Sequence, residues 1–398
     1  MSIIIFGDSF TFPDGNAATN RVHTYAKGFH ENGFNVHVIC FGSRYNSSGN
    51  GYSKGIYYYH PFGQRNRNKY FIIRSWHKII KYFKTFILLI KINKQDKILF
   101  LNCWTQVLLT LFFASLLSKY FCAKIVLERS EHPLRKYQSS YLRKAKGNII
   151  SCFETLLSDG IFCISNFLID FYKNRGVEEK KLFLVPGTVD TERFQELSIS
   201  PFPFKYILYC GSLTLIKDGV NILIKSFAEI SNVHPDIKLV LIGKGDSIKE
   251  ESFIKDLVLT MNLRDRIIFT GQLHRNDIPV FLNNATILAL ARPQSLVADA
   301  GFPSKLTEYL ATGIPIVVTK VGDIPIYLKD GENAFLSIPD SVEAFADKLD
   351  FVLNNYHFAK EVASEGKKLT FTVFNYNFQA RRMIEFIYTL NPNASNNK

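Results

Sequence analysis

A short segment bounded by glycines, "GFPSKLTEYLATG" at 301–313, combines features that suit an anionic sugar ligand. It predicts a helix that begins near Pro303 or Ser304 and ends at Gly313. The free N–H groups and the dipole at the start of a helix stabilise an anion such as a diphosphate. Glu308, about one turn inside the helix, can accept two hydrogen bonds from neighbouring ribose hydroxyls. The alternative is an exposed helical glutamate that binds nothing.

A lysine in a glycine-flanked loop is a second candidate for binding phosphate. The stretch "YCGSLTLIKDGV" (209–220) places Gly211, Ser212 and Lys217 after an apolar strand. The ammonium group of lysine is a compact point charge that suits a diphosphate. A solvated surface lysine is the alternative interpretation.

Two pairs of residues in the first half of the chain could also contact a ligand. Gly15 and Asn16 stand at the start of a predicted helix over 16–33, where N–H groups can hold an anion or a sugar hydroxyl. Glu131 and His132 come just before a proline, which predicts a loop. A histidine beside a carboxylate can orient a substrate hydroxyl or take a proton. For both pairs, the alternative is a plain connection between elements.

These candidates follow short apolar strands that alternate with helices. Near-continuous apolar strands in this alternation indicate parallel sheets covered on both faces. Ligands of such sheets bind beyond the carboxyl ends of the strands, where the candidates stand. The expected strands are 3–6, 35–41, 97–101, 124–128, 160–165, 181–187, 206–211, 237–243, 266–271, 286–291 and 314–319.

The domain organisation follows from length and from one linker-like segment. A chain of 398 residues predicts about two domains, and Pro, Ser and charged residues cluster at 188–204. We expect an N-terminal domain over 1–190 and a C-terminal domain over 191–372. A last helix within 373–398 is expected to pack back on the N-terminal domain and to end in a frayed tail. The predicted fold class is α/β, with two Rossmann-like doubly wound domains.

The overall charge favours anionic partners. The net charge is +13, from 48 basic and 35 acidic residues, which suits a membrane surface or phosphorylated substrates. Nucleic acid is not an expected partner, because no nucleic-acid-binding motif is found. The six cysteines form no CxxC pair, which predicts free thiols in a reducing cytosol. We expect neither a signal peptide nor a membrane-spanning segment.

The segment 64–95 is basic and aromatic, with nine Lys or Arg residues and no Asp or Glu. It predicts an amphipathic helix that lies in a membrane interface. The alternative is a helix packed on the core with a solvated basic face. Arg74, Lys78, Lys81 and Lys84 fall on one helical stripe, and Ile72, Trp76, Ile79, Phe83, Phe86 and Ile90 fall near another.

Taken together, the motifs resemble those of a retaining glycosyltransferase of the GT-B fold, family 4 (glycosyl transferases group 1). The resemblance is carried by "GFPSKLTEYLATGIPIVVT", by "VGDIPIYLKDGENAFL" (321–336), by the segment 163–194 and by "GSLTLIKDGVNILIKSFAEI". It implies two Rossmann-like domains that face each other across a cleft. The N-terminal domain would bind the acceptor and the C-terminal domain the nucleotide-sugar.

The resemblance also implies roles for individual residues. Lys217 would bind the donor diphosphate and Glu308 the ribose, while His132, beside Glu131, would lie near the transferred sugar. The turn at Gly15 and Asn16 would face the donor sugar or the acceptor. The donor-binding set would further include Gly211, Ser212, Arg292, Asp299, Gly301, Phe302, Pro303, Ser304, Lys305 and Leu306.

Two positions depart from the family's pattern. The family has two glutamates spaced as E-x7-E, and this chain has Ala300 at the first of them, with Asp299 one place earlier. It has Ser212 where the family often has arginine, and Arg292 is a candidate for the missing positive charge. No D-x-D motif occurs, so we expect neither a metal nor another cofactor.

The implied activity is transfer of a sugar from a nucleotide-sugar with retention at the anomeric carbon. With the basic segment, it predicts a lipid-linked saccharide acceptor at the cytoplasmic face of the cell membrane, in surface polysaccharide or glycan biosynthesis. A non-catalytic binding protein of the same fold and a nucleotide-sugar epimerase are the alternatives.

Overall fold

The computed structural model describes residues 1–398 except 16, 43–48, 62–69, 134–140, 197–198 and 391–398, and the side chains of 71–75, 77–78 and 141–146. The chain divides into two compact units. The N-terminal unit comprises Met1–Thr188 and Tyr376–Lys398, and the C-terminal unit comprises Val189–Asn375. Each unit is built around one sheet.

The sheet of the N-terminal unit has eight strands in the order β3-β4-β2-β1-β5-β6-β7-β8. All neighbouring strands are parallel except β3 and β4. The central strands are buried along their whole length, which explains why they are almost continuously apolar. The strands are β1 (Ser2–Gly7), β2 (Asn35–Cys40), β3 (Gly51–Ser53), β4 (Ile56–Tyr59), β5 (Ile98–Trp104), β6 (Lys124–Arg129), β7 (Gly160–Cys163) and β8 (Leu182–Leu184).

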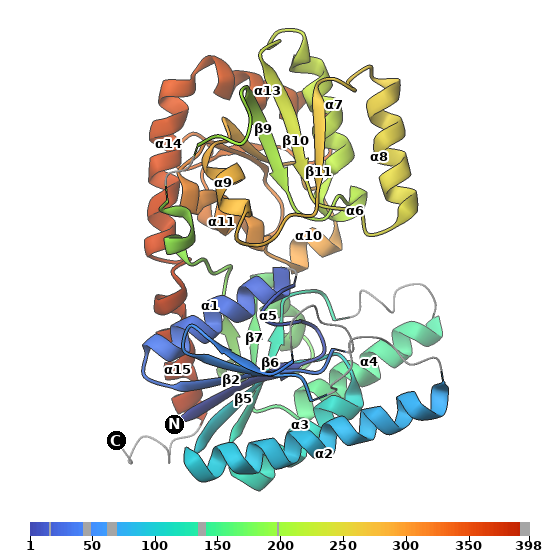
Figure 1. The fold of residues 1–398 in the computed structure, drawn as a ribbon, viewed down its shortest axis with the longest axis vertical. Coiled ribbons are helices and arrows are strands. Elements are labelled where there is room, and N and C mark those ends of the chain that lie inside the picture. The colour runs from blue at the N-terminus through green and yellow to red at the C-terminus, as the bar shows by residue number, and fades with distance from the viewer. Residues whose placement is uncertain (16, 43–48, 62–69, 134–140, 197–198, 391–398) are drawn as a thin grey trace. The chain divides into compact units, whose positions relative to one another are not determined.

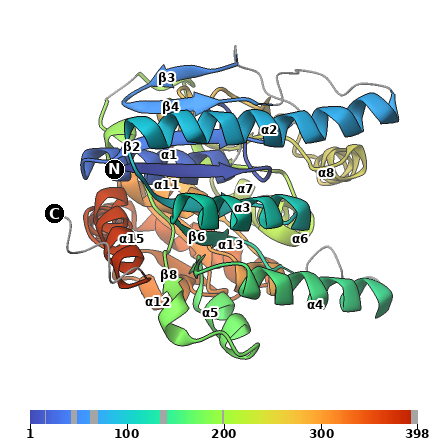
Figure 2. The same cartoon turned by 90° about the horizontal axis from the view of Figure 1, so that it is seen from below.

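Helices cover both faces of this sheet. Helices α2, α3 and α4 lie in a row on one face (Figures 1 and 2), and α1 packs against α15. The helices of this unit are α1 (Ala17–Glu31), α2 (Phe71–Gln95), α3 (Leu108–Phe121), α4 (Tyr141–Leu156), α5 (Asn166–Lys173) and α15 (Tyr376–Leu390), with the 3-10 turn η2 (Glu179–Lys181).

The last helix of the chain, α15, belongs to the core of the N-terminal unit. Phe386 of α15 stacks on Phe183 of β8, with ring centroids 4.9 Å apart. Gly28 of α1 lies so close to α15 that a Cβ there would be 2.6 Å from Cβ of Ala380. The glycine therefore allows the two helices to approach each other closely.

The sheet of the C-terminal unit has six parallel strands in the order β11-β10-β9-β12-β13-β14. The chain builds outward from β9 in one direction and from β12 in the other, so the switch point lies between these two strands. The strands are β9 (Lys205–Cys210), β10 (Ile237–Ile242), β11 (Ile267–Gly271), β12 (Ile287–Leu290), β13 (Ile316–Thr319) and β14 (Phe335–Ser337).

The C-terminal unit also has helices on both faces of its sheet (Figure 1). Helix α7 packs against α13, and α11 packs against α14 and η3. The helices are α6 (Leu215–Asp218), α7 (Val220–Ser231), α8 (Ile248–Thr260), α9 (Ile278–Asn283), α10 (Leu296–Ala300), α11 (Ser304–Thr312), α12 (Ile324–Tyr327), α13 (Val342–Asn354) and α14 (Tyr356–Lys368), with the 3-10 turns η3 (Thr191–Phe194) and η4 (Leu369–Phe371).

Two parallel, helix-covered sheets confirm the predicted α/β class with two Rossmann-like units. The short strands β3, β4 and β14 were not expected from the apolar pattern. Within the described part of the chain, no helix is both long enough and apolar enough to cross a membrane.

Candidate donor site in the C-terminal unit

Three segments of the C-terminal unit meet at the switch point between β9 and β12. A Cβ on Gly211, directly after β9, would collide with the ammonium group of Lys305 in α11. A Cβ on Gly219 would collide with the backbone oxygen of Ala291, directly after β12. Gly219 has a φ of 65°, which glycine adopts without strain. The two glycines thus allow loops that are far apart in the sequence to converge.

Helix α11 begins and ends as its sequence predicts. Pro303 precedes its first residue without a side-chain cap, and Gly313 ends it with a φ of 74°. The first turn holds no acidic residue, so no carboxylate there neutralises the positive end of the helix dipole. Its backbone N–H groups can therefore contribute to an anion site.

Lys305 of α11 is the cation that lies above the loop after β9. Its Nζ is 3.0 Å from Oδ2 of Asp218 and 2.8 Å from the hydroxyl of Tyr209. The same ammonium group lies 4.5 Å from the centroid of the Tyr209 ring. Burial lowers the pKa of Lys305, and the charge of Asp218 opposes that shift.

Asp218 stands among three positive charges. Burial alone would raise its pKa, but the charges of Lys305, Arg292 and Lys217 hold the pKa below its ordinary value. One carboxylate against three cations leaves this end of the sheet positively charged. Such a surplus suits a diphosphate, which carries more than one negative charge.

Arg292 supports the loop that carries Lys217. Its side chain is buried, and its Nε donates to the backbone oxygen of Lys217 at 3.2 Å. The backbone oxygen of Arg292 in turn accepts from Thr319 at 2.6 Å. Arg292 therefore has a structural contact as well as a charge. Lys305 lies against Gly211, which directly precedes Ser212.

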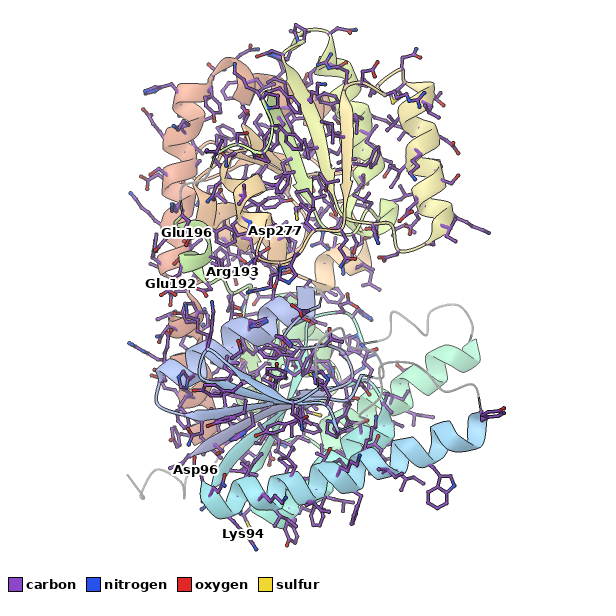
Figure 3. The ribbon with its side chains drawn as sticks, viewed as in Figure 1. Lys94, Asp96, Glu192, Arg193, Glu196 and Asp277 are labelled. Atoms are coloured by element: carbon purple, nitrogen blue, oxygen red, sulfur yellow. The ribbon has the colours of Figure 1, made fainter. Side chains whose placement is uncertain are left out.

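Glu308 is paired with an arginine that the sequence interpretation missed. Nη1 of Arg193, in η3, lies 2.5 Å from Oε1 of Glu308, and Nη2 donates to the backbone oxygen of Arg275 at 3.1 Å. Figure 3 labels Arg193 and also Asp277, which precedes α9. Arg193 stands within the charged linker segment, but nothing in the sequence shows that it reaches a residue 115 positions away.

The residues between Asp299 and Phe302 have distinct environments. Oδ1 of Asp299 accepts from Nε2 of Gln294 at 2.7 Å, while Ala300 is fully buried. The ring of Phe302 is buried against Tyr327, with centroids 5.6 Å apart. The side chain of Phe302 therefore belongs to the core, and only its backbone is suited to a ligand.

The comparisons with known proteins identify this unit. Residues 190–369 match the family model described as "Glycosyl transferases group 1". The matched segment covers nearly the whole C-terminal unit. Its donor-site candidates Lys217, Lys305 and Glu308 all lie within the matched segment.

A relative and two solved structures extend the comparison. An uncharacterised glycosyltransferase of Methanocaldococcus jannaschii is 25% identical over 183 residues, which are 45% of this chain and 44% of that protein. The chain spans between 44% and 65% of the length of such curated relatives.

Sucrose-phosphate synthase from Thermosynechococcus elongatus has a TM-score of 0.74 at 16% identity, over 98% of this chain and 99% of that one. The Anabaena protein HepE in complex with UDP-glucose has a TM-score of 0.69 at 14% identity, over 98% and 100%. This likeness shows that the chain has the GT-B fold.

The candidates of the first half of the chain lie in the N-terminal unit. His132 is buried, with its ring 5.0 Å from that of Phe171 in α5. Burial and, to a smaller extent, the charge of Arg175 lower the pKa of His132, which favours the neutral imidazole. Gly15 is enclosed, because a Cβ there would collide with Thr11 and Thr19. Asn16 lies outside the described residues.

An aspartate at the end of β1 is a further residue that sequence interpretation missed. Oδ2 of Asp8 accepts from the hydroxyl of Thr105 at 3.1 Å. Burial raises the pKa of Asp8, and the Thr105 hydrogen bond and the charge of Lys81 oppose that shift. Asp8 is therefore a carboxyl group at the carboxyl ends of β1 and β5, where parallel sheets bind ligands.

Lys81 corrects the expectation for the basic segment. Its side chain is only 8% exposed, and its Nζ lies 4.8 Å from the centroid of the Phe41 ring. Lys81 thus points toward the sheet and not to the outer stripe. Lys84 and Trp76 are exposed, and the side chains of Arg74 and Lys78 lie outside the described part.

The described residues include no group of three or more His, Cys, Asp or Glu that could hold a metal ion. The expectation that the reaction needs neither metal nor other cofactor stays a prediction.

Proposed function

We propose that this protein transfers a sugar from a nucleotide-sugar to a saccharide acceptor with retention at the anomeric carbon. The observation that carries the proposal is the cluster of Lys305, Lys217 and Arg292 around Asp218, beside the first turn of α11. The cluster lies in the segment that matches the glycosyl transferases group 1 family model. Its surplus of positive charge matches the diphosphate of a nucleotide-sugar.

The chemistry follows from where negative charge develops. The bond between the anomeric carbon and the diphosphate oxygen breaks, and the acceptor hydroxyl forms a new bond to the same face of that carbon. The acceptor proton passes to the departing phosphate oxygen. Lys217, Lys305 and the N-terminus of α11 stabilise the leaving diphosphate, and fixed cations in a partly buried site are effective in this role.

Glu308 is proposed to bind the ribose hydroxyls of the donor. Its pairing with Arg193 holds the carboxylate in one orientation. His132 and Asp8 are candidates for contacts to the sugar or the acceptor.

The acceptor is proposed to be a lipid-linked saccharide at the inner face of the cell membrane, in surface polysaccharide or glycan biosynthesis. The support is the basic helix α2 with its exposed Trp76 and Phe83. A nucleotide-sugar epimerase, which acts on a free nucleotide, has no use for such a helix. A non-catalytic binding protein would keep the donor site without turnover.

The test is the melting temperature of the purified full chain with UDP, GDP, ADP and their glucose conjugates. A ligand at 100 times its Kd adds about 2.7 kcal/mol to the free energy of unfolding. One nucleotide should raise the melting temperature of the wild type and of the control Lys249→Ala, but not of Lys217→Ala or Glu308→Ala. If no nucleotide raises it, the donor site is not functional.

Two product assays separate the alternatives. Slow release of the nucleoside diphosphate from the bound donor, without an acceptor, indicates a transferase. Conversion of UDP-glucose to another UDP-sugar indicates an epimerase, and binding without any turnover indicates a scaffold protein. NMR of the transferred sugar shows whether its anomeric configuration is retained.

A further inference from the structure

Three neighbouring helices of the N-terminal unit expose apolar side chains along their outer sides. On α2, Trp76 is 61% and Phe83 is 65% exposed; on α3, Leu116 is 67% exposed; on α4, Leu156 is 72% exposed. The other exposed members are Ile79, Ile80, Ile87, Leu109, Phe112, Tyr120 and Ile149. On α2 and α3, most of these residues repeat at intervals of three or four, and the two on α4 are seven apart, so within each helix they share one side.

The stripes belong to one continuous surface. The ring of Phe86 in α2 lies 5.2 Å from that of Tyr120 in α3. The ring of Phe112 in α3 lies 5.5 Å from that of Phe153 in α4. Figure 2 shows the three helices side by side on one face of the unit. Contiguous exposed apolar surface of this extent is unusual for a monomeric soluble protein.

The charged side chains within these three helices are almost all positive. Helices α2 and α3 contain no Asp or Glu. The single acidic residue of α4, Glu154, is buried and paired with Arg129 at 2.9 Å. Lys84 and Lys119 are exposed, as is Lys94 at the C-terminal end of α2 (Figure 3). A protein partner would need an apolar surface of similar size surrounded by acidic residues. An anionic bilayer offers an apolar interior and negatively charged headgroups together.

We propose that the outer surface of α2, α3 and α4 binds an anionic lipid bilayer, with the apolar stripes in the headgroup region and the lysines on phosphate groups. Trp, Tyr and Phe beside Lys are typical of surfaces that lie in a membrane interface. This extends the binding surface from α2 to three helices and excludes Lys81, which points toward the sheet. The proposal goes beyond sugar transfer, and vesicle binding can be measured whether or not the protein transfers a sugar.

The first test is sedimentation of the purified full chain with phosphatidylcholine vesicles, with and without phosphatidylglycerol. We expect binding to the anionic vesicles and little to the neutral ones. The variant Leu109→Ser/Leu116→Ser should bind anionic vesicles at least about tenfold more weakly, because two apolar side chains that the bilayer would bury are lost. Its control, Val233→Ser/Ile248→Ser, removes two exposed apolar residues of the C-terminal unit and should bind as the wild type does.

The charge variant is Lys84→Glu/Lys119→Glu, with Lys249→Glu/Lys255→Glu on α8 as its matched control. We expect about tenfold weaker binding for the first, since each basic residue near an anionic surface contributes about 1 kcal/mol, and no change for the second. Circular dichroism checks that each variant is folded. Equal binding by wild type and both helix-surface variants would overturn the proposal.

A thiol measurement locates the contact. Cys122 and Cys152 are the exposed cysteines, and Cys152 lies between Ile149 and Leu156 on α4. In a Cys122→Ser variant, anionic vesicles should slow the reaction of Cys152 with a water-soluble thiol reagent. Vesicle binding without this protection would place the contact elsewhere. If light scattering shows a dimer that Leu109→Ser/Leu116→Ser converts to a monomer, a second copy covers the surface instead.

Discussion

Arg193 and Glu308 form an ion pair across 115 residues of sequence, with Nη1 and Oε1 2.5 Å apart. Both side chains are largely buried, at 11% and 13% exposure. The pair joins η3, near the start of the C-terminal unit, to the helix whose N-terminus forms the candidate phosphate site. The orientation of the carboxylate proposed to bind ribose thus depends on a residue outside the loops of the site.

Arg193→Ala is expected to weaken UDP binding about tenfold, because a charge-assisted hydrogen bond that orients Glu308 is lost. Isothermal titration calorimetry with UDP measures the Kd. If GDP or ADP raises the melting temperature more than UDP does, that nucleotide is used instead. Arg193→Lys should retain part of the affinity, since lysine keeps the positive charge but lacks the several N–H donors of the planar guanidinium group. An unchanged Kd in Arg193→Ala would show that the pair only stabilises the unit.

Lys305 is expected to supply the positive charge that Ser212 lacks. Lys305→Ala should weaken UDP binding by about tenfold or more while uridine binding stays unchanged, because uridine has no phosphate. The substitution also leaves Asp218 buried without this cation, which costs about 3–5 kcal/mol.

The double variant Lys305→Ala/Asp218→Asn separates these two effects. It should regain much of the lost free energy of unfolding in urea titrations, yet still bind UDP weakly. If the double variant binds UDP as the wild type does, Lys305 serves the fold and not the donor.

Stability should fall with acid because His37 is buried. Burial lowers the pKa of His37 from 6.5 to about 4, so the folded protein resists a proton that the unfolded chain accepts. The resulting stabilisation is complete above pH 6.5 and is lost as the pH falls toward about 4. A shift of this size corresponds to about 3 kcal/mol. Urea titrations at pH 7 and pH 5 measure the free energy of unfolding. The decrease in this free energy between the two pH values should be smaller for His37→Gln than for the wild type.

The contact between α1 and α15 predicts a specific pair of compensating changes. Gly28→Ala places a Cβ about where Ala380 already lies, and should cost about 1–3 kcal/mol of overpacking. Ala380→Gly should restore part of that loss in the double variant, as measured by thermal unfolding. The backbone oxygen of Tyr376, 2.9 Å from the same Cβ position, limits the recovery. Full stability in Gly28→Ala alone would contradict this packing of the last helix.

The local elements were largely set by the sequence itself. Apolar runs at 3–6 and 206–211 become buried central strands of parallel sheets, because such strands are covered on both faces. Helix α11 begins after Pro303 and ends at Gly313, since proline favours the start of a helix and glycine adopts the positive φ at its end.

The pairings at the candidate site were decided only by the tertiary structure. Lys305 and Asp218, or Arg193 and Glu308, are far apart in sequence, and no local pattern encodes which strands and loops come together. The direction of Lys81 was equally undetermined, because a helix with both a basic and an apolar stripe can turn either one toward the sheet. Lys81 is buried against the ring of Phe41, and its charge acts on Asp8, while Trp76 and Phe83 are exposed. Periodicity fixes which side chains share a face, whereas only the surrounding elements fix what that face meets.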